Sequence, residues 1–247
     1  MLVLGLDFET TGLNTSQDKI IEIGAVLWDT VRGSPLVCLN ELLWCEDIWD
    51  NATNPKEKIE QITKIKYEDL INYGIHPCEG FEKLNQLMRT PDLVAVVAHN
   101  GDEFDKPILF NEHNAKRWGV ELPDLPWIDT QYDIPYGPEI PTRKLSYVAT
   151  EHGFINPFPH RALFDVLTMM KIAQNYDVDW MVKISKTPFV RLIALTEFHQ
   201  NDDVKAKGFI FQSSIKKWVR KIRECQLQSV KGSLGFDVKE VRQTPTL

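Results

Sequence analysis

Two carboxylates near the start of the chain, Asp7 and Glu9, lie two positions apart at the end of an apolar segment, residues 2–6. On a strand, this spacing places both side chains on the same side of the sheet. Burying two carboxylates side by side costs free energy unless cations neutralise them. The pair therefore indicates a metal site, but two further acidic pairs with this spacing occur in the chain, so the pair alone is weak evidence.

The residues that follow the acidic pair strengthen this interpretation. In order, the segment reads Asp7-Phe8-Glu9-Thr10-Thr11-Gly12-Leu13. Small residues and a glycine turn thus come directly after the acids. Backbone amides between Thr10 and Leu13 would lie close to whatever the metal holds, and such amides suit the phosphate and sugar of a nucleotide.

A histidine and an aspartate, His160 and Asp165, lie five positions apart in a later segment. The apolar residues Leu163, Val166 and Met170 define one face of a helix there, and Asp165 interrupts the apolar run. A carboxylate in such surroundings needs a partner, for example a metal ion. Because an imidazole exchanges protons near neutral pH, His160 is a candidate general base.

The pattern of apolar residues predicts the scaffold that positions these side chains. Residues 2–7, 19–28 and 36–44 have the composition of three successive strands. From residues 93–98 onwards, strand candidates alternate with segments of helical periodicity. This order predicts an α/β fold in which helices flank a mixed sheet.

The distribution of charge divides the chain. The net charge is −7, but residues 1–185 carry 16 basic and 29 acidic side chains, whereas residues 186–231 carry 10 basic and 4 acidic ones. We therefore predict one domain over residues 1–185 and a small basic α+β module over residues 186–231 that leans on it. Residues 232–247 have little apolar content and are predicted to form a flexible tail.

The acidic and histidine segments resemble the motifs of the DnaQ-like DEDDh 3′→5′ exonucleases, over about the first 175 residues. In that family a second motif follows a buried strand and supplies a third carboxylate. Here that motif reads His99-Asn100-Gly101-Asp102-Glu103-Phe104-Asp105.

The form of the second motif with Gly101 and Asp102 is most similar to the mammalian three-prime repair exonucleases and to some bacterial and phage relatives. Its additional residue makes Asp105, rather than Asp102, the match. Arg161 stands where the tyrosine-type class has tyrosine, which favours the histidine subclass.

The resemblance implies an RNase H-like mixed five-stranded sheet and a two-metal site. Asp7 would bridge two divalent cations, Glu9 and Asp165 would serve the cation that carries the attacking water, and Asp105 would help to hold the other. Oxygen ligands of this kind suit Mg²⁺ or Mn²⁺. His160 would act as a base and not as a ligand.

We expect the 3′ end of the substrate to contact residues beside the acids of the first two motifs. These residues are Thr10, Thr11, Gly12, Leu13, His99, Asn100 and Phe104. In relatives, the hydrophobic residue that matches Leu13 packs against the terminal bases. The expected reaction releases 5′-mononucleotides one at a time from the 3′ end of DNA, either single-stranded or frayed.

The basic module allows two interpretations. Its cationic residues and Trp218 could bind a single strand through phosphate contacts and base stacking. Alternatively, they form a solvated basic face, with Trp218 in a small core. The cationic residues concerned are Lys216, Lys217, Arg220, Lys221 and Arg223.

Two other functions remain open on the sequence: an exonuclease acting on short RNA, and an inactive nucleic-acid-binding partner of a polymerase. A complete set of four acids favours an enzyme. Because the chain lacks polymerase motifs, proofreading would need a separate polymerase or replication partner. The longest notable apolar run, residues 93–98, is too short to cross a membrane, and the first residues do not resemble a secretory leader, so we expect a cytoplasmic protein.

Overall fold

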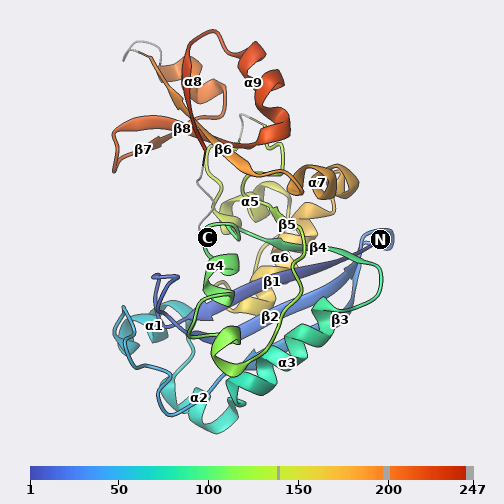
Figure 1. The fold of residues 1–247 in the computed structure, drawn as a ribbon, viewed down its shortest axis with the longest axis vertical. Helices are drawn as coiled ribbons and strands as arrows, with labels where there is room; N and C mark the ends of the chain where they lie inside the picture. Colours follow the sequence, from blue (N-terminus) through green and yellow to red (C-terminus); the bar gives the residue numbers. More distant parts are fainter. Residues whose placement is uncertain (138–139, 197–200, 243–247) are drawn as a thin grey trace.

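A five-stranded sheet forms the centre of the larger part of the molecule (Figure 1). The computed structural model describes residues 1–137, 140–196 and 201–242. The strand order is β3-β2-β1-β4-β5, with β1 antiparallel to β2 and parallel to β4. The strands are β1 (Leu2–Thr10), β2 (Ile20–Asp29), β3 (Ser34–Leu42), β4 (Leu93–Ala98) and β5 (Trp127–Asp129). The predicted mixed sheet of five strands is therefore confirmed.

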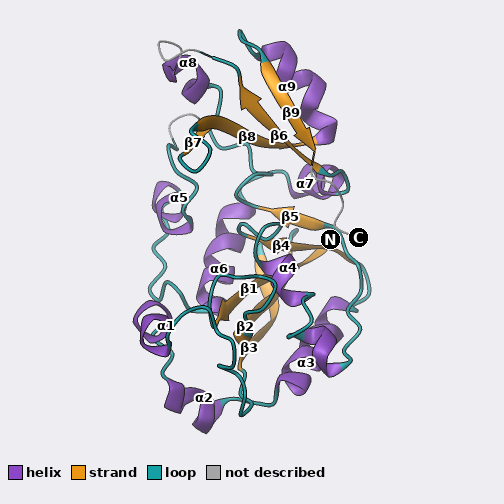
Figure 2. Ribbon diagram, turned by 60° about the vertical axis from the view of Figure 1, so that its left-hand side comes forward, coloured by secondary structure: helices purple, strands orange, loops and turns teal. Residues whose placement is uncertain are grey.

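Helices cover both faces of this sheet (Figure 2). The helices of this part are α1 (Lys56–Thr63), α2 (Tyr67–Tyr73), α3 (Pro77–Met88), α4 (Asp105–Leu109), the short 3₁₀ helix η1 (Ala115–Trp118), α5 (Leu145–Glu151), α6 (Ala162–Ala173) and α7 (Val178–Ser185). Helix α3 packs on one face, and α6 packs on β1 and β2 from the other. Within the described residues, no helix has the length and apolarity needed to span a bilayer.

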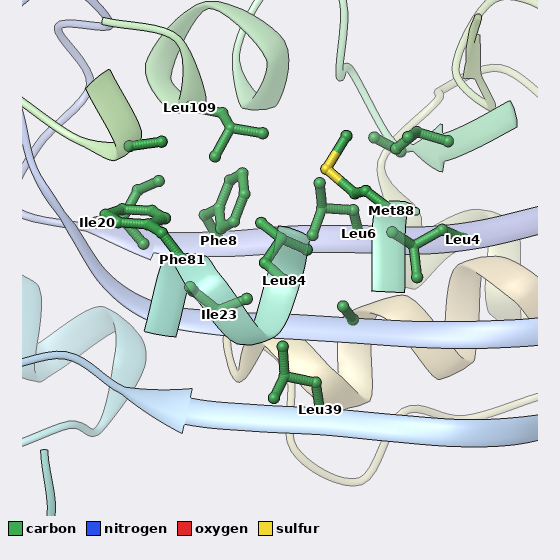
Figure 3. Packing of buried hydrophobic residues seen from close by; sticks show 14 of the residues in the cluster. Leu4, Leu6, Phe8, Ile20, Ile23, Leu39, Phe81, Leu84, Met88 and Leu109 are labelled. Carbon is green, nitrogen blue, oxygen red and sulfur yellow. The ribbon is translucent and has the colours of Figure 1, made fainter. Parts of the chain in front are cut away.

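The alternation of side chains along β1 separates core residues from acids. Leu4, Leu6 and Phe8 point into the core beneath α3 (Figure 3). Val3 belongs to the opposite core, which includes side chains of α6. Because successive side chains of a strand point to opposite faces, Asp7 and Glu9 lie on the α6 face.

The C-terminal module, residues 189–242, contains the smaller sheet, with strand order β7-β8-β6-β9. Its elements are β6 (Phe189–Ala194), α8 (Asn201–Ala206), β7 (Ile210–Gln212), β8 (Lys217–Arg223), the 3₁₀ helix η3 (Glu224–Gln226), α9 (Leu227–Ser233) and β9 (Val238–Arg242). A small core that includes Val190, Leu192, Phe209 and Ile222 holds them together. The predicted α+β appendage is thus present.

The prediction of a flexible tail from residue 232 is wrong for residues 232–242. Strand β9 pairs with β6 in antiparallel register, from Val190 with Arg242 to Ala194 with Val238. Phe236 and Val238 also pack against the core of the module. An edge strand with alternating charges gains its stability from the strand beside it, which composition alone does not reveal. Residues 243–247 lie outside the described part of the chain.

Two basic side chains of β8 join the module to the larger domain. The guanidinium of Arg223 binds both carboxylate oxygens of Asp133, at 2.7 and 2.6 Å, and also donates to the carbonyl of Trp127. Lys221 pairs with Asp102 at 3.0 Å and with Glu103 at 3.2 Å.

These contacts exclude both sequence-based interpretations for two residues of the set. Lys221 and Arg223, considered above as phosphate-binding or solvated cations, are both buried against acids of the larger domain. The sequence pattern could not distinguish a cation that faces solvent from one that faces a buried acid. Only Lys216, Lys217 and Arg220 of the predicted set retain at least partial exposure.

We predict that Arg223→Met lowers the free energy of unfolding by about 3 to 5 kcal/mol, because it leaves the buried carboxylate of Asp133 without its counter-charge. Urea denaturation followed by tryptophan fluorescence would measure the change. The double variant Arg223→Met/Asp133→Leu should recover much of the loss, since it removes the unpaired charge as well. Equal midpoints for the parent and the single variant would contradict this role.

Candidate active site

The end of β1 brings its two acids against the start of α6. Asp7 pairs with Gly24 of β2, and Glu9 pairs with Glu22. A Cβ atom on Gly24 would lie 2.3 Å from the backbone carbon of Ala162, the first residue of α6. Glycine is therefore required at position 24, because only a residue without a side chain lets the helix approach the acids this closely.

The first turn of α6 adds an aspartate and the loop before it adds a histidine. Ligand atoms of Glu9, His160 and Asp165 all lie within 4.8 Å of one another. The backbone amide of His160 donates to Asp165 Oδ2 at 2.9 Å, and the side-chain amide of Asn156 donates to Oδ1 at 2.7 Å. His160 has φ of +62°, an uncommon conformation for a non-glycine residue, and the contact with Asp165 helps to hold it.

The fourth acid, Asp105, is buried at the start of α4, only 1% exposed. Its Oδ1 atom has no hydrogen-bond partner among the described residues, which is rare for a buried oxygen. Asp102, the alternative in the same loop, is instead paired with Lys221. The geometry thus agrees with the sequence-based preference for Asp105 over Asp102.

The four acids are coupled electrostatically, although among the described residues the only group of three or more possible ligands within 4.8 Å of one another is Glu9, Asp165 and His160. We call Asp7, Glu9, Asp105 and Asp165 the acidic cluster. Burial raises the pKa of Asp7 well above its ordinary value, and the charges of Asp105, Glu9 and Asp165 raise it further. Burial, followed by the charges of Glu22 and Asp165, likewise raises the pKa of Glu9.

The other two acids of the cluster are perturbed in the same direction. Burial, with the charge of Asp129 as the next cause, raises the pKa of Asp105 to about 8. Burial also raises the pKa of Asp165 to about 6, even though the amide and the charge of His160 oppose this shift. Four carboxylates that repel one another, one of them with an unsatisfied oxygen, fit the binding of divalent cations through oxygen ligands.

Sequence reasoning missed an ion pair that borders the cluster. Glu22, fully buried on β2, accepts from Arg161 Nη2 at 2.7 Å and from the amide of Ala162 at 3.0 Å. The positive charge of Arg161 lowers the pKa of Glu9 and so opposes the effect of the neighbouring acids on it. Glu22, the one acid within the apolar segment 20–28, was the only signal for this pair in the sequence.

The loop after the acidic pair is held from within by Asp18. Thr11 is fully buried, its hydroxyl donates to Asp18 Oδ1 at 2.9 Å, and its amide donates to the carbonyl of Lys19. A Cβ atom on Gly12 would lie 2.5 Å from Asp18 Oδ2. The structure therefore gives Thr11 and Gly12 a role in shaping the loop, and does not support direct contact of the Thr11 side chain with a substrate.

The remaining predicted contacts of this loop differ in their exposure. The hydroxyl of Thr10 donates to the carbonyl of Gly12 at 2.6 Å, so it too stabilises the turn. Leu13 is 76% exposed beside the turn. An apolar side chain this open to solvent is free to pack against a base.

In the second motif, His99 is held by the protein on both sides of its ring. Nε2 donates to the carbonyl of Arg143 at 2.6 Å, and Nδ1 lies 2.9 Å from the hydroxyl of Thr130. Burial lowers the pKa of His99 to about 4, so the ring is neutral at neutral pH. The structure does not support the prediction that His99 contacts the substrate through its ring nitrogens.

The other two predicted residues of the second motif shape the loop around Asp105. Asn100 has φ of +69°, and its amide donates to Asp129 Oδ1 at 2.9 Å. Phe104 packs, partly buried, against the core beneath α3. Asp129 also accepts from the amide of Asp102, so a buried acid of β5 holds this loop in place.

Comparison with known proteins identifies the fold and the family. The model of the RNase_T exonuclease family matches residues 4–173, which include all four acids of the cluster and His160. The chain belongs to the RNase_T exonuclease family. This match confirms the resemblance that the sequence motifs carry.

Curated relatives of this chain include two longer proteins. DNA polymerase III PolC-type of Ureaplasma parvum serovar 3 is 32% identical over 124 residues, which cover 50% of this chain and 8% of the polymerase. Exonuclease DPD1, chloroplastic/mitochondrial, of Arabidopsis thaliana is 29% identical over 203 residues, which cover 75% of this chain and 59% of that protein. The chain thus spans less than two thirds of either relative.

Solved structures of exonucleases have the same fold as this chain. E. coli Exonuclease I in complex with a dT13 oligonucleotide superposes with a TM-score of 0.55 at 14% identity, covering 79% of this chain and 48% of that one. The nuclease domain of 3′hExo, a DEDDh family member bound to rAMP, gives 0.54 at 17% identity, covering 70% and 90%. The shared architecture is the RNase H-like fold expected from the sequence.

Without divalent cations, the acidic cluster should make the folded protein less stable as the pH rises. The folded-state pKa values of Asp105, about 8, and Asp165, about 6, lie above the value near 4 of an aspartate in an unfolded chain. Stability from protonation is therefore present below about pH 4 and is lost as the pH rises through these values to about 8.

In EDTA, we expect the midpoint temperature of thermal unfolding to decrease as the pH is raised from 5 to 8. Mg²⁺ or Mn²⁺ should raise this temperature more at pH 8 than at pH 5, because cations compete with protons for the carboxylates. Asp7→Asn should raise the midpoint in EDTA at pH 8 and abolish the response to the cations. Asp179→Asn, an exposed acid of α7, is the matched control. A midpoint in Asp7→Asn that follows the parent under every condition would contradict the assignment.

Proposed function

We propose that the protein is a metal-dependent 3′→5′ exonuclease that hydrolyses phosphodiester bonds at the 3′ end of DNA, single-stranded or frayed, and releases 5′-mononucleotides. The observation that carries this proposal is the convergence of four mutually repelling acids with a histidine at the carboxyl end of β1. Membership of an exonuclease family supports it independently.

The acids are assigned to cation binding and the histidine to proton transfer. Asp7, Glu9, Asp105 and Asp165 would hold two divalent cations, Mg²⁺ or Mn²⁺, and the unpaired oxygen of Asp105 fits a ligand role. When bound, the cations would supply positive charge that activates a water and stabilises the leaving oxygen. This chemistry requires no redox-active or zinc-type site.

His160 is suited to accept the proton of the attacking water. Its ring is exposed, while its backbone amide is fixed by Asp165, so the ring can reach a substrate without losing its anchor. The geometry alone would also allow His160 to ligate a cation beside Glu9 and Asp165. The role of base is preferred because oxygen ligands suit hard cations better than an imidazole does.

The choice of DNA over RNA rests on likeness to proteins of known structure. The E. coli Exonuclease I structures contain dT13 or dA16 oligonucleotides, and DPD1 is named as an exonuclease. The second candidate is an exoribonuclease, because a similar 3′-exonuclease structure concerns a histone mRNA stem-loop and the 3′hExo structure contains rAMP. A separate polymerase partner is a further proposal, supported by the likeness to a PolC-type polymerase.

An inactive nucleic-acid-binding protein is the less favoured alternative. Such a protein would bear the cost of burying four like charges without using the cations that offset it. The presence of all four acids, together with the uncommon backbone conformation of His160, supports catalysis instead.

We predict that His160→Ala lowers the turnover number by about 10²- to 10⁴-fold, the contribution of a general base. The variant should keep the increase in thermal stability that Mg²⁺ gives the parent, because a base is not a ligand. Asp7→Asn should lose both the activity and the response to Mg²⁺. Turnover of His160→Ala equal to that of the parent, or loss of its response to Mg²⁺, would contradict the role of base.

The direct test is a digest of 5′-labelled oligonucleotides with Mg²⁺, comparing the parent with Asp7→Asn and with the exposed-acid control Asp179→Asn. Single-stranded DNA, 3′-recessed DNA and RNA of the same sequences should be used. A ladder of 5′-labelled products shortened stepwise, in the parent and the control only, is expected. Preference for the RNA strand would favour the second candidate, and no degradation of any strand would refute the enzyme.

A further inference from the structure

A cleft of about 530 Å³ lies between the larger domain and the C-terminal module. One wall is formed by the segment that follows β5, including Tyr132 and Arg143, and the other by β7, β8 and the end of α8. In Figure 2, β7, α5 and α1 lie along the same side of the molecule. Nothing in the catalytic chemistry described above uses this cleft.

The cleft adjoins the second motif. Glu103, two residues before Asp105, is part of its lining. The carbonyl of Arg143, a second lining residue, accepts from His99 at the end of β4. A strand whose 3′ end reaches the acidic cluster would therefore pass the mouth of this cleft with its upstream nucleotides.

The lining is strongly positive once internal ion pairs are considered. Six described lining residues are basic and two are acidic. Both acids are already neutralised, Glu103 by Arg191 at 2.6 Å and by Lys221, and Asp133 by Arg223. The remaining positive charge of the lining comes from its other basic residues, Arg143, Lys205, Lys207 and Arg220.

Three of these cations, Lys205, Lys207 and Arg220, have no carboxylate partner within residues 1–137, 140–196 and 201–242. Arg220 donates to the carbonyl of Lys207 at 2.7 Å, which fixes the guanidinium at the cleft wall. Burial and the nearby positive charge of Arg143 lower the pKa of Arg220. An anion in the cleft would relieve this repulsion.

Aromatic side chains accompany the cations. Phe211 lines the cleft, is 50% exposed, and contacts Trp218 edge to face at 5.5 Å between ring centroids. Tyr132 lies on the opposite wall. Cations interleaved with exposed rings bind the phosphates and bases of single-stranded nucleic acid, whereas a free phosphate would have no use for the rings.

We propose that this cleft binds the single strand upstream of the scissile end, with its phosphates on Lys205, Lys207 and Arg220 and a base on Phe211. The proposal rests on the function proposed above in assuming that a nucleic acid 3′ end enters the acidic cluster. It implies that long strands are held at two places and short ones at the cluster alone.

The test uses the double variant Lys205→Glu/Lys207→Glu, because both side chains are exposed and their replacement does not disturb a core. The matched control is Lys171→Glu/Lys239→Glu, which changes the net charge equally at two exposed lysines outside the cleft. Fluorescence anisotropy in EDTA gives the Kd of labelled dT20 and its dependence on salt. Hydrolysis of dT4 with Mg²⁺ gives the activity at the cluster.

We expect the cleft variant to bind dT20 at least tenfold more weakly than the control. The slope of log Kd against log salt should fall by about 1.4, because each phosphate contact on a single strand contributes roughly 0.7. Hydrolysis of dT4 should match that of the parent. As a second variant, Phe211→Ala should weaken the binding of dT20 while leaving the salt slope unchanged.

Each other outcome is decisive. If the cleft variant binds dT20 with the same Kd and the same salt slope as the control, the cleft proposal is overturned, even if the protein degrades both dT20 and dT4. Weakened binding of dT20 in a protein whose parent degrades neither strand would uphold the cleft and refute the exonuclease. Displacement of dT20 from the protein by millimolar inorganic phosphate would indicate a site for small anions and would also overturn the proposal.

Discussion

The repulsion between buried carboxylates at the carboxyl end of β1 is the constraint on which the rest of the structure depends. A folded chain gathers four such groups only if their positions are imposed by elements that are stable for other reasons. The apolar sides of β1 and α6 supply that stability, and Gly24 allows the helix to approach the strand closely enough. The pKa values of all four acids rise as a consequence, so the site is poised to exchange protons for cations.

Much of this arrangement could be predicted from sequence because the information is local. Two acids at a strand end share a face by geometry, and Asp165 stands out because it interrupts an apolar helix face. The order of strand and helix patterns was sufficient for the mixed sheet. The choice of Asp105 over Asp102 depended on one additional residue in a motif, and the buried position of Asp105 agrees with it.

The features that sequence reasoning missed are contacts between distant residues. Arg161 and Glu22 are far apart in the chain, and neither position shows that the other neutralises it. The sequence around Lys221 would look the same whether its side chain faced water or, as it does, Asp102. Strand β9 forms because β6 offers an edge. In the two motif loops, the side chains of Thr11 and His99 bind within the protein, and Asn100 is held through its backbone amide.

The ion pair between Arg223 and Asp133 has a consequence for how the chain can be divided. Asp133 also accepts from the amide of Asp129, whose own carboxylate holds the amides of Asn100 and Asp102 beside Asp105. A fragment cut at the apparent boundary near residue 186 would not be a nuclease relieved of an accessory. It would carry an uncompensated acid underneath the loop that leads to Asp105, so removal of the module would weaken the support of that loop.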